Sequence, residues 1–151
     1  MQSLNLPAFQ FKFALRKGKK IIFDPFRKRF VALSPEEWVR QHFLAWLHFY
    51  KGYPVGLISV EASLRYNNMH KRADAIVYSK TGKPLMIIEC KAADVMITQE
   101  AFDQIARYNF SFGVRYLAVT NGVEHYCCTR ADIESQWVFL EGVPDYENLL
   151  Q

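Results

Sequence analysis

Three charged residues stand in two otherwise apolar segments, where an isolated charge needs a compensating partner. Glu89 and Lys91 lie two residues apart in Leu-Met-Ile-Ile-Glu-Cys-Lys, and Asp74 lies in the preceding segment Ala-Asp-Ala-Ile-Val. Residues two apart on a β-strand emerge on the same face, so Glu89 and Lys91 would form a pair. Charged groups on apolar strands are costly to bury unless they are paired or bind a metal. The spacing therefore predicts two carboxylates and an ammonium group at one edge of a sheet.

Such a cluster could hold a metal ion and act on a phosphodiester. Two carboxylates with nearby backbone carbonyls and waters provide the oxygen ligands that Mg²⁺ prefers. A bound Mg²⁺ polarises a phosphoryl oxygen and lowers the pKa of a water, while a lysine stabilises the water or the developing charge. The alternative is an ordinary ion pair of Lys91 with Asp74 or Glu89. The acidic residue on the preceding segment favours the metal site over the ion pair.

Turn signals predict how these residues come together. A turn at Lys-Thr-Gly-Lys, residues 80–83, would fold the Asp74 segment back alongside Glu89. A second turn is expected at Asn67-Asn68, and Asn121-Gly122 is a two-residue hairpin signal. Strands are expected at residues 9–15, 20–23, 29–33, 57–66, 72–79, 85–91, 114–120, 123–129 and 137–140, with 85–91 as a central strand.

A helix is expected between the early strands and those that carry the charged residues. Ser34 is a good N-cap, Pro35 suits the first helical position, and Glu37 stands three residues after the cap. Apolar residues at helical spacing extend the helix to about Lys51, and Gly52 would end it.

The order of the elements is strands, helix, three strands, helix and strands, which predicts an α/β fold with a mixed β-sheet flanked by helices. The 151 residues, half of them hydrophobic and 23% charged, fit a single domain over 1–151. Within it we expect an N-terminal β meander at 1–33, a core at 34–130 and a C-terminal extension at 131–151.

Several classes of protein are disfavoured by the sequence. Cys90, Cys127 and Cys128 are odd in number and lack zinc-motif spacing, so we expect reduced, buried thiols. No apolar run approaches the roughly 18 residues of a membrane span, and the N-terminus lacks the order of a signal peptide, so the expected compartment is cytoplasmic. The pattern G-x-x-x-x-G-K-[ST] of ATP motors is absent.

The two charged segments resemble the core signature of the PD-(D/E)xK nuclease superfamily. The matching stretches are Arg72–Val77 and Ile87–Ala92, with Ala73 standing where the superfamily has proline. More narrowly, together with Pro35–Gln41 and Val119–Gly122, they resemble the N-terminal nuclease module of type I restriction enzyme R (HsdR-type) subunits. The similarity covers about residues 34–130 and implies a restriction-endonuclease-like fold.

The resemblance implies a DNA endonuclease that depends on Mg²⁺, with Mn²⁺ as a substitute. Asp74 and Glu89 would ligate the metal with the carbonyl of Cys90, and Lys91 would position the nucleophilic water. Glu37 would be the acidic residue of the first helix, although its place in a capping box could also explain it. The implied partners are DNA and the motor or specificity subunits of a restriction system, with no membrane; a homodimer is left open.

A second helix, capped by Thr98 and running to about Ser111, adds two further candidates. Gln104 and Tyr108 are four residues apart and share a helix face. The pattern Q-x-x-x-Y after E-x-K resembles the extra motif of RecB-type nucleases, in which both side chains help orient the metal site and the DNA. The alternative for Tyr108 is a core aromatic, since it follows Ile105 at helical spacing.

Two functions of different class stay open. One is an active endonuclease, which the joint presence of the candidate residues favours. The other is a nuclease-fold module that binds DNA or assembles with partners without cutting. A small-molecule enzyme using Cys90 or Cys127 is disfavoured because neither cysteine has a partnered base in the sequence.

The basic residues between Lys12 and Arg29 generate a prediction about DNA affinity. This stretch carries eight Lys and Arg residues and one acid, Asp24, and could either contact phosphates or serve solubility. If it contacts DNA, charge reversal at Lys17, Lys19 and Lys20 should flatten the slope of log affinity against log salt concentration. An unchanged slope in a binding titration would assign these residues to solubility.

Overall fold

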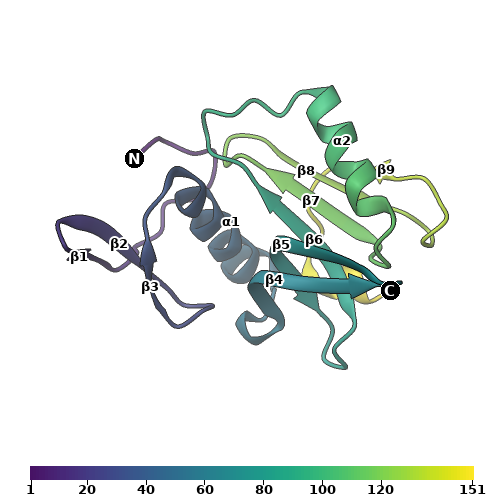
Figure 1. The fold of residues 1–151 in the computed structure, drawn as a ribbon, viewed down its shortest axis with the longest axis horizontal. Helices are drawn as coiled ribbons and strands as arrows, with labels where there is room; N and C mark the ends of the chain where they lie inside the picture. Colours follow the sequence, from purple (N-terminus) through teal and green to yellow (C-terminus); the bar gives the residue numbers. More distant parts are fainter.

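The chain forms two β-sheets and two α-helices (Figure 1). The computed structural model describes the backbone of residues 1–151 and every side chain except that of Tyr66. The elements are β1 (Phe13–Arg16), β2 (Lys19–Asp24), β3 (Arg29–Ala32), α1 (Pro35–Lys51), η1 (Val55–Leu57), β4 (Ile58–Tyr66), β5 (Met69–Tyr78), β6 (Pro84–Cys90), α2 (Gln99–Phe110), β7 (Tyr116–Thr120), β8 (His125–Thr129), β9 (Val138–Phe139) and η2 (Tyr146–Leu150).

The larger sheet has six strands in the order β4-β5-β6-β7-β8-β9. All neighbours pair antiparallel except β6 and β7, which are parallel. A parallel pair needs a crossover connection, and α2 supplies it between these two strands. The expectation that residues 85–91 form a central strand is therefore confirmed, with bounds of Pro84–Cys90.

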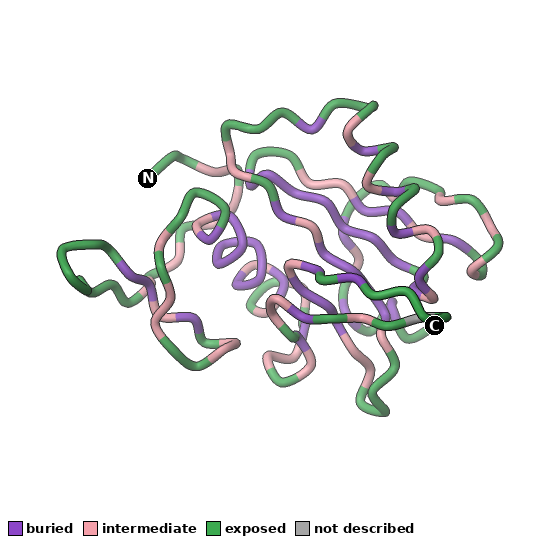
Figure 2. The backbone as a smooth tube through the Cα atoms, viewed as in Figure 1, coloured by how far each residue is buried: buried purple, intermediate pink, exposed green. Residues whose placement is uncertain are grey.

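The two helices cover opposite faces of the six-stranded sheet. Alternate residues of a strand point to opposite faces, and on β6 the side chains of Met86 and Ile88 join the core that contains α1, while Ile87 joins the core that contains α2. Figure 2 shows these central strands and much of α1 as buried and the β1–β2 hairpin as largely exposed. The predicted α/β fold, a mixed sheet flanked by helices, is confirmed.

Helix α1 begins and ends where the sequence predicts. The Ser34 Oγ accepts a hydrogen bond of 3.0 Å from the backbone N–H of Glu37, so Ser34 is the N-cap. Gly52 adopts a left-handed conformation with φ of 75° and ends the helix, a backbone state that glycine reaches without strain. Thr98 caps α2 in the same way as Ser34 caps α1.

The first and the last predicted hairpins differ from expectation. The first strand begins at Phe13 rather than residue 9, because Phe9 and Phe11 pack on α1, with the Phe11 ring 4.8 Å from that of His42. The loop between β7 and β8 spans residues 121–124 between the paired Thr120 and His125, so the predicted two-residue turn is wrong. The Asn121 carboxamide lengthens it by accepting two backbone N–H groups of the loop.

Two expectations from the composition concern the cysteines and membrane-spanning helices. All three cysteines are buried and free of disulfides, as predicted. Burial raises the pKa of the Cys90 thiol and raises that of Cys127 to about 12, so both are neutral thiols rather than nucleophiles. Among the described residues, no helix has the length and apolar character needed to cross a bilayer.

Arg130 joins the end of α2 to the sheet and generates a stability prediction. Its guanidinium is buried and donates to the backbone carbonyls of Phe110, Phe112 and Val114. Arg130→Met should lower the free energy of unfolding by about 3 kcal/mol, because buried carbonyls lose their donor. Denaturant titration measures this change. Arg107→Met on the exposed face of α2 is the matched control, and equal effects of the two would contradict the prediction.

Candidate functional site

Two carboxylates meet where β5 and β6 lie side by side. Ala75 pairs with Ile88, so the next position of the register sets Asp74 opposite Glu89. Opposite residues of antiparallel strands share a face. The Asp74 Oδ2 also accepts a 2.7 Å hydrogen bond from the backbone N–H of Cys90, which fixes that carboxylate at the end of β6. The turn at residues 80–83 thus folds the Asp74 strand alongside Glu89, as the sequence predicts.

The counter-charge of Glu89 comes from Lys71 on β5, not from Lys91. The Lys71 side chain is buried and its ammonium contacts the Oε1 of Glu89 as an ion pair. This ammonium is the cation that compensates the buried Oε1. Burial raises the pKa of Glu89, the ammonium of Lys71 lowers it, and the Asp74 carboxylate raises it again, with a net rise.

Lys91 lies beyond the end of the strand that carries Glu89. Strand β6 ends at Cys90, and the Lys91 backbone N–H donates to the carbonyl of Thr120 on β7. Its side chain is exposed and has no ion pair with any residue that the structure describes. The predicted pairing of Lys91 with Asp74 or Glu89 is therefore wrong, since the chain leaves the strand before this residue. The role of Lys91 in positioning the nucleophilic water or stabilising charge on the phosphate stays a prediction.

The carboxylate of Glu37 lies in a network of donors on α1 and the meander. Arg27 donates to its Oε1 at 2.7 Å and Arg40 to the same oxygen at 2.9 Å. Gln41 donates to its Oε2 at 2.8 Å. The side chain of Glu37 thus turns away from the capping-box position, and capping alone does not account for this buried acid.

Arginines connect Glu37 to the carboxylates of the sheet. Arg40 reaches Asp74 Oδ1 at 3.4 Å, and Arg27 reaches Glu61 Oε1 on β4 at 2.9 Å. Glu61 has a φ of 50°, an uncommon state for a residue inside a strand, and it also accepts from Arg72 at 3.0 Å. We name these groups together the charge cluster. Its members are Asp24, Arg27, Glu37, Arg40, Glu61, Lys71, Arg72, Asp74 and Glu89.

The charge cluster fits a divalent cation in its charge and its donors. Its five carboxylates face four cationic side chains, which leaves one excess negative charge. The buried Oε1 of Glu89, which contacts the Lys71 ammonium, is an acceptor of the kind that a cation compensates. Among the side chains described, no group of three or more His, Cys, Asp or Glu is arranged to hold a metal. A metal here would therefore bind Asp74 and Glu89 and take its other ligands from backbone carbonyls and water.

The two candidates on α2 differ in their contacts with this cluster. Helix α2 packs on the sheet through Phe102, Ala106 and Asn109, so Gln104 and Tyr108 fall outside the packed stripe. Tyr108 is 58% exposed, and the expected alternative of a core aromatic is wrong. Its ring nevertheless lies 4.5 Å from the Lys71 ammonium. Gln104 is exposed and has no hydrogen bond to the described part of the chain.

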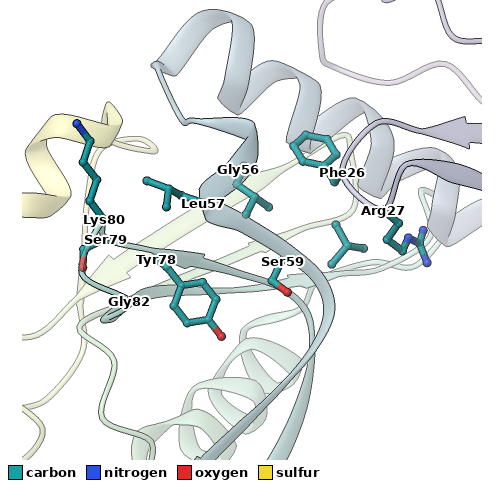
Figure 3. A pocket seen from close by; sticks show the side chains of 11 residues that line it. Phe26, Arg27, Gly56, Leu57, Ser59, Tyr78, Ser79, Lys80 and Gly82 are labelled. Carbon is teal, nitrogen blue, oxygen red and sulfur yellow. The ribbon is translucent and has the colours of Figure 1, made fainter.

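A pocket of about 360 Å³ lies beside one end of the charge cluster (Figure 3). It is lined by the start of β4 and the end of β5, with Arg27 at one side and Lys80 at the other. Of the charge cluster, only Arg27 lines it, and neither Asp74 nor Glu89 does. The pocket thus lies beside Arg27 and is not the space between the two carboxylates.

Six members of the charge cluster were not predicted from the sequence as residues of the site: Asp24, Arg27, Arg40, Glu61, Lys71 and Arg72. The available signals were the alternation of Glu61 and Lys71 with apolar residues on their strands and the place of Arg40 on the first-helix face that carries Glu37. Arg27 has one partner close in sequence, Asp24, but its other partners, Glu37 and Glu61, lie 10 and 34 residues away and gave no local signal.

The lowered pKa of Glu61 generates a pH prediction. The hydrogen bond from Arg72 and the charges of Arg27 and Arg40 lower this pKa, although burial opposes them. The stabilisation is therefore present above the pKa of an unfolded glutamate and is lost as the pH falls through the lower pKa of the folded state. The side chain is partly exposed, so we expect the pH-dependent part to be under about 1 kcal/mol.

The measurement is the difference in unfolding free energy between the native chain and Glu61→Gln. It should be largest at pH 7 and shrink as the pH falls below about 4.3, the ordinary value for a glutamate. Glu141→Gln, at an exposed glutamate, should show no such trend. A difference for Glu61→Gln that stays constant with pH would contradict the assignment.

Comparisons with known proteins add a family to this geometry. The family model described as type I restriction enzyme R protein N terminus (HSDR_N) matches residues 35–144. A search of curated proteins finds no match. A similar solved structure is that of an Anabaena variabilis ATCC 29413 protein, provisionally described as a nuclease of DUF820, at a TM-score of 0.46 and 11% identity over 90% of this chain and 80% of that one. Because the family model spans more than half of the chain, the protein belongs to the type I restriction enzyme R N-terminal (HSDR_N) family.

Proposed function

We propose that this chain is a metal-dependent deoxyribonuclease module whose site is built on Asp74, Glu89 and Lys91. The observation that carries the proposal is the pair of carboxylates on adjacent strands in a cluster with excess negative charge. Buried like charges are unfavourable unless a cation joins them. Membership of the family supports DNA as the substrate and a restriction system as the setting, with motor or specificity subunits as partners.

Each residue of the proposed site has its own role in hydrolysis. Asp74 and Glu89, with the carbonyl of Cys90, would hold Mg²⁺, or Mn²⁺ in its place. When bound, the metal supplies charge stabilisation at the phosphoryl group and a water of lowered pKa. The backbone N–H of Cys90 orients Asp74, and Arg40 approaches its other oxygen. Lys91 is exposed at the end of β6, where it can reach a water or a phosphate oxygen.

The remaining candidate residues have supporting roles in this proposal. Glu37 holds Arg40 and Arg27 in place through hydrogen bonds to one oxygen. The ring of Tyr108 lies over the ammonium of Lys71 and helps to hold that ammonium against Glu89. The exposed Gln104 is available to a phosphate of the DNA. Exposed lysines and arginines of β1, β2 and the loops around them would add contacts to the DNA backbone without specifying sequence.

A non-cleaving module is the second candidate function. The observation that favours it is the ion pair of Glu89 with Lys71, because an ammonium already neutralises one of the two proposed ligands. In that case the cluster would be a structural core, and DNA or a partner subunit would bind elsewhere on the surface. The two candidates differ in whether divalent metal produces cleavage.

Lys91→Ala tests the proposed activity. It should reduce the rate of cleavage by about 100-fold or more, the scale of losing one preorganised charge-stabilising group. Because Lys91 is exposed and unpaired in the part of the chain described, melting and DNA affinity should stay nearly unchanged. The assay compares plasmid, linear duplex and single-stranded DNA in Mg²⁺, in Mn²⁺ and in EDTA.

The matched control is Lys80→Ala in the turn at the other end of the β5–β6 hairpin, which should cleave like the native chain. Asp74→Asn with Glu89→Gln should abolish Mn²⁺ binding in calorimetry. Equal cleavage by Lys91→Ala and the native chain would reject the role of Lys91. A native chain that binds DNA but cuts no substrate with either metal would favour the non-cleaving module.

A further inference from the structure

Lys71 is a lysine in an unusual position, because its ammonium is inside the protein. Its side chain is 5% exposed, and it lies on β5 opposite Leu64 of β4. Lysine is among the residues least often fully buried, and an unpaired buried ammonium is strongly unfavourable. The position therefore requires that the protein provide a specific environment for the charge.

That environment has two parts, a carboxylate and an aromatic ring. The Oε1 of Glu89 is its ionic partner, and the ring of Tyr108 lies 4.5 Å from the nitrogen. A ring face attracts a cation through its quadrupole, more strongly when water is excluded. Tyr108 itself is 58% exposed, so the aromatic cover can move aside without opening the core.

The same carboxylate oxygen is the one that a divalent cation would need. Glu89 Oε1 is buried, and the ammonium of Lys71 is the cation that contacts and compensates it. Two cations cannot lie at one oxygen without repelling each other. Binding of a metal at Asp74 and Glu89 therefore requires that the Lys71 ammonium leave.

We propose that Lys71 is a resident counter-cation of the carboxylate pair, which stabilises Glu89 in the metal-free protein and is displaced from it when a divalent cation binds. This inference rests on the proposed metal site. Lys71 thereby sets the metal affinity and makes it weaker than the two carboxylates alone would give. The flexible four-carbon stem of lysine allows the ammonium to move outward past Tyr108.

The decisive variant is Lys71→Met, which keeps the length and most of the volume of the side chain and removes its charge. Calorimetric titration with Mn²⁺ should show binding about tenfold or more tighter than in the native chain, equivalent to about 1.4 kcal/mol. In EDTA the variant should melt at a lower temperature than the native chain, because Glu89 loses its cation. Saturating Mn²⁺ should narrow that difference. Lys80→Met, in the turn at the opposite end of the hairpin, is the control and should bind Mn²⁺ like the native chain.

A second measurement uses the native chain and does not depend on the folding of the variant. In a spectrum of lysine ε-methylene groups labelled with ¹³C, saturating Mg²⁺ should shift the Lys71 resonance and leave that of Lys80 in place. A Lys71 resonance that stays in place while Mg²⁺ shifts the backbone amide of Asp74 would overturn the displacement.

The outcomes separate this inference from the proposed function. Equal or weaker Mn²⁺ binding by Lys71→Met, with binding by the native chain, would overturn the role of Lys71 and leave the metal site standing. Absence of Mn²⁺ binding in both chains would overturn both proposals.

Discussion

Charge compensation among partly buried carboxylates is the constraint on which the rest of the site depends. Asp74 and Glu89 are opposite each other on adjacent strands, and both are only partly exposed to water. Cationic side chains from β5, α1 and the loop after β2 pair with the carboxylates of the charge cluster. Since a buried carboxylate without a partner is costly, these elements are held in place by the same charges that they neutralise. Packing and electrostatics therefore favour the same arrangement of sheet, helix and meander.

The local part of the fold was accessible from the sequence because its signals are local. Ser34 and Gly52 bound α1 through side-chain capping and a left-handed backbone, both of which depend on residue type at one position. The turn at residues 80–83 joins β5 to β6 and so brings Asp74 alongside Glu89. The identity of the two central carboxylates could thus be predicted before the sheet was known.

The partners of those carboxylates were not accessible in the same way. Strand alternation favoured Lys91 as the partner of Glu89, but β6 ends one residue earlier and the cation is Lys71 on the neighbouring strand. Spacing describes one strand, whereas an ion pair between strands depends on register and on where each strand ends. Similarly, the positive φ of Glu61 belongs to an irregularity between β4 and β5 that residue type does not indicate.

The ion pairs between the meander and α1 affect which stretch of the chain forms one structural unit. The family match begins at residue 35, yet Arg27 and Asp24 come before it, and Arg27 binds both Glu37 and Glu61. The stretch that the family model matches therefore leaves out residues that pair with its charged side chains. A recombinant fragment or chimaera cut at the boundary of the family match would retain Glu37 and Glu61 and lose the guanidinium that bridges them. For any relative that lacks this meander, a cation from another part of its own chain or from a partner would have to take that place.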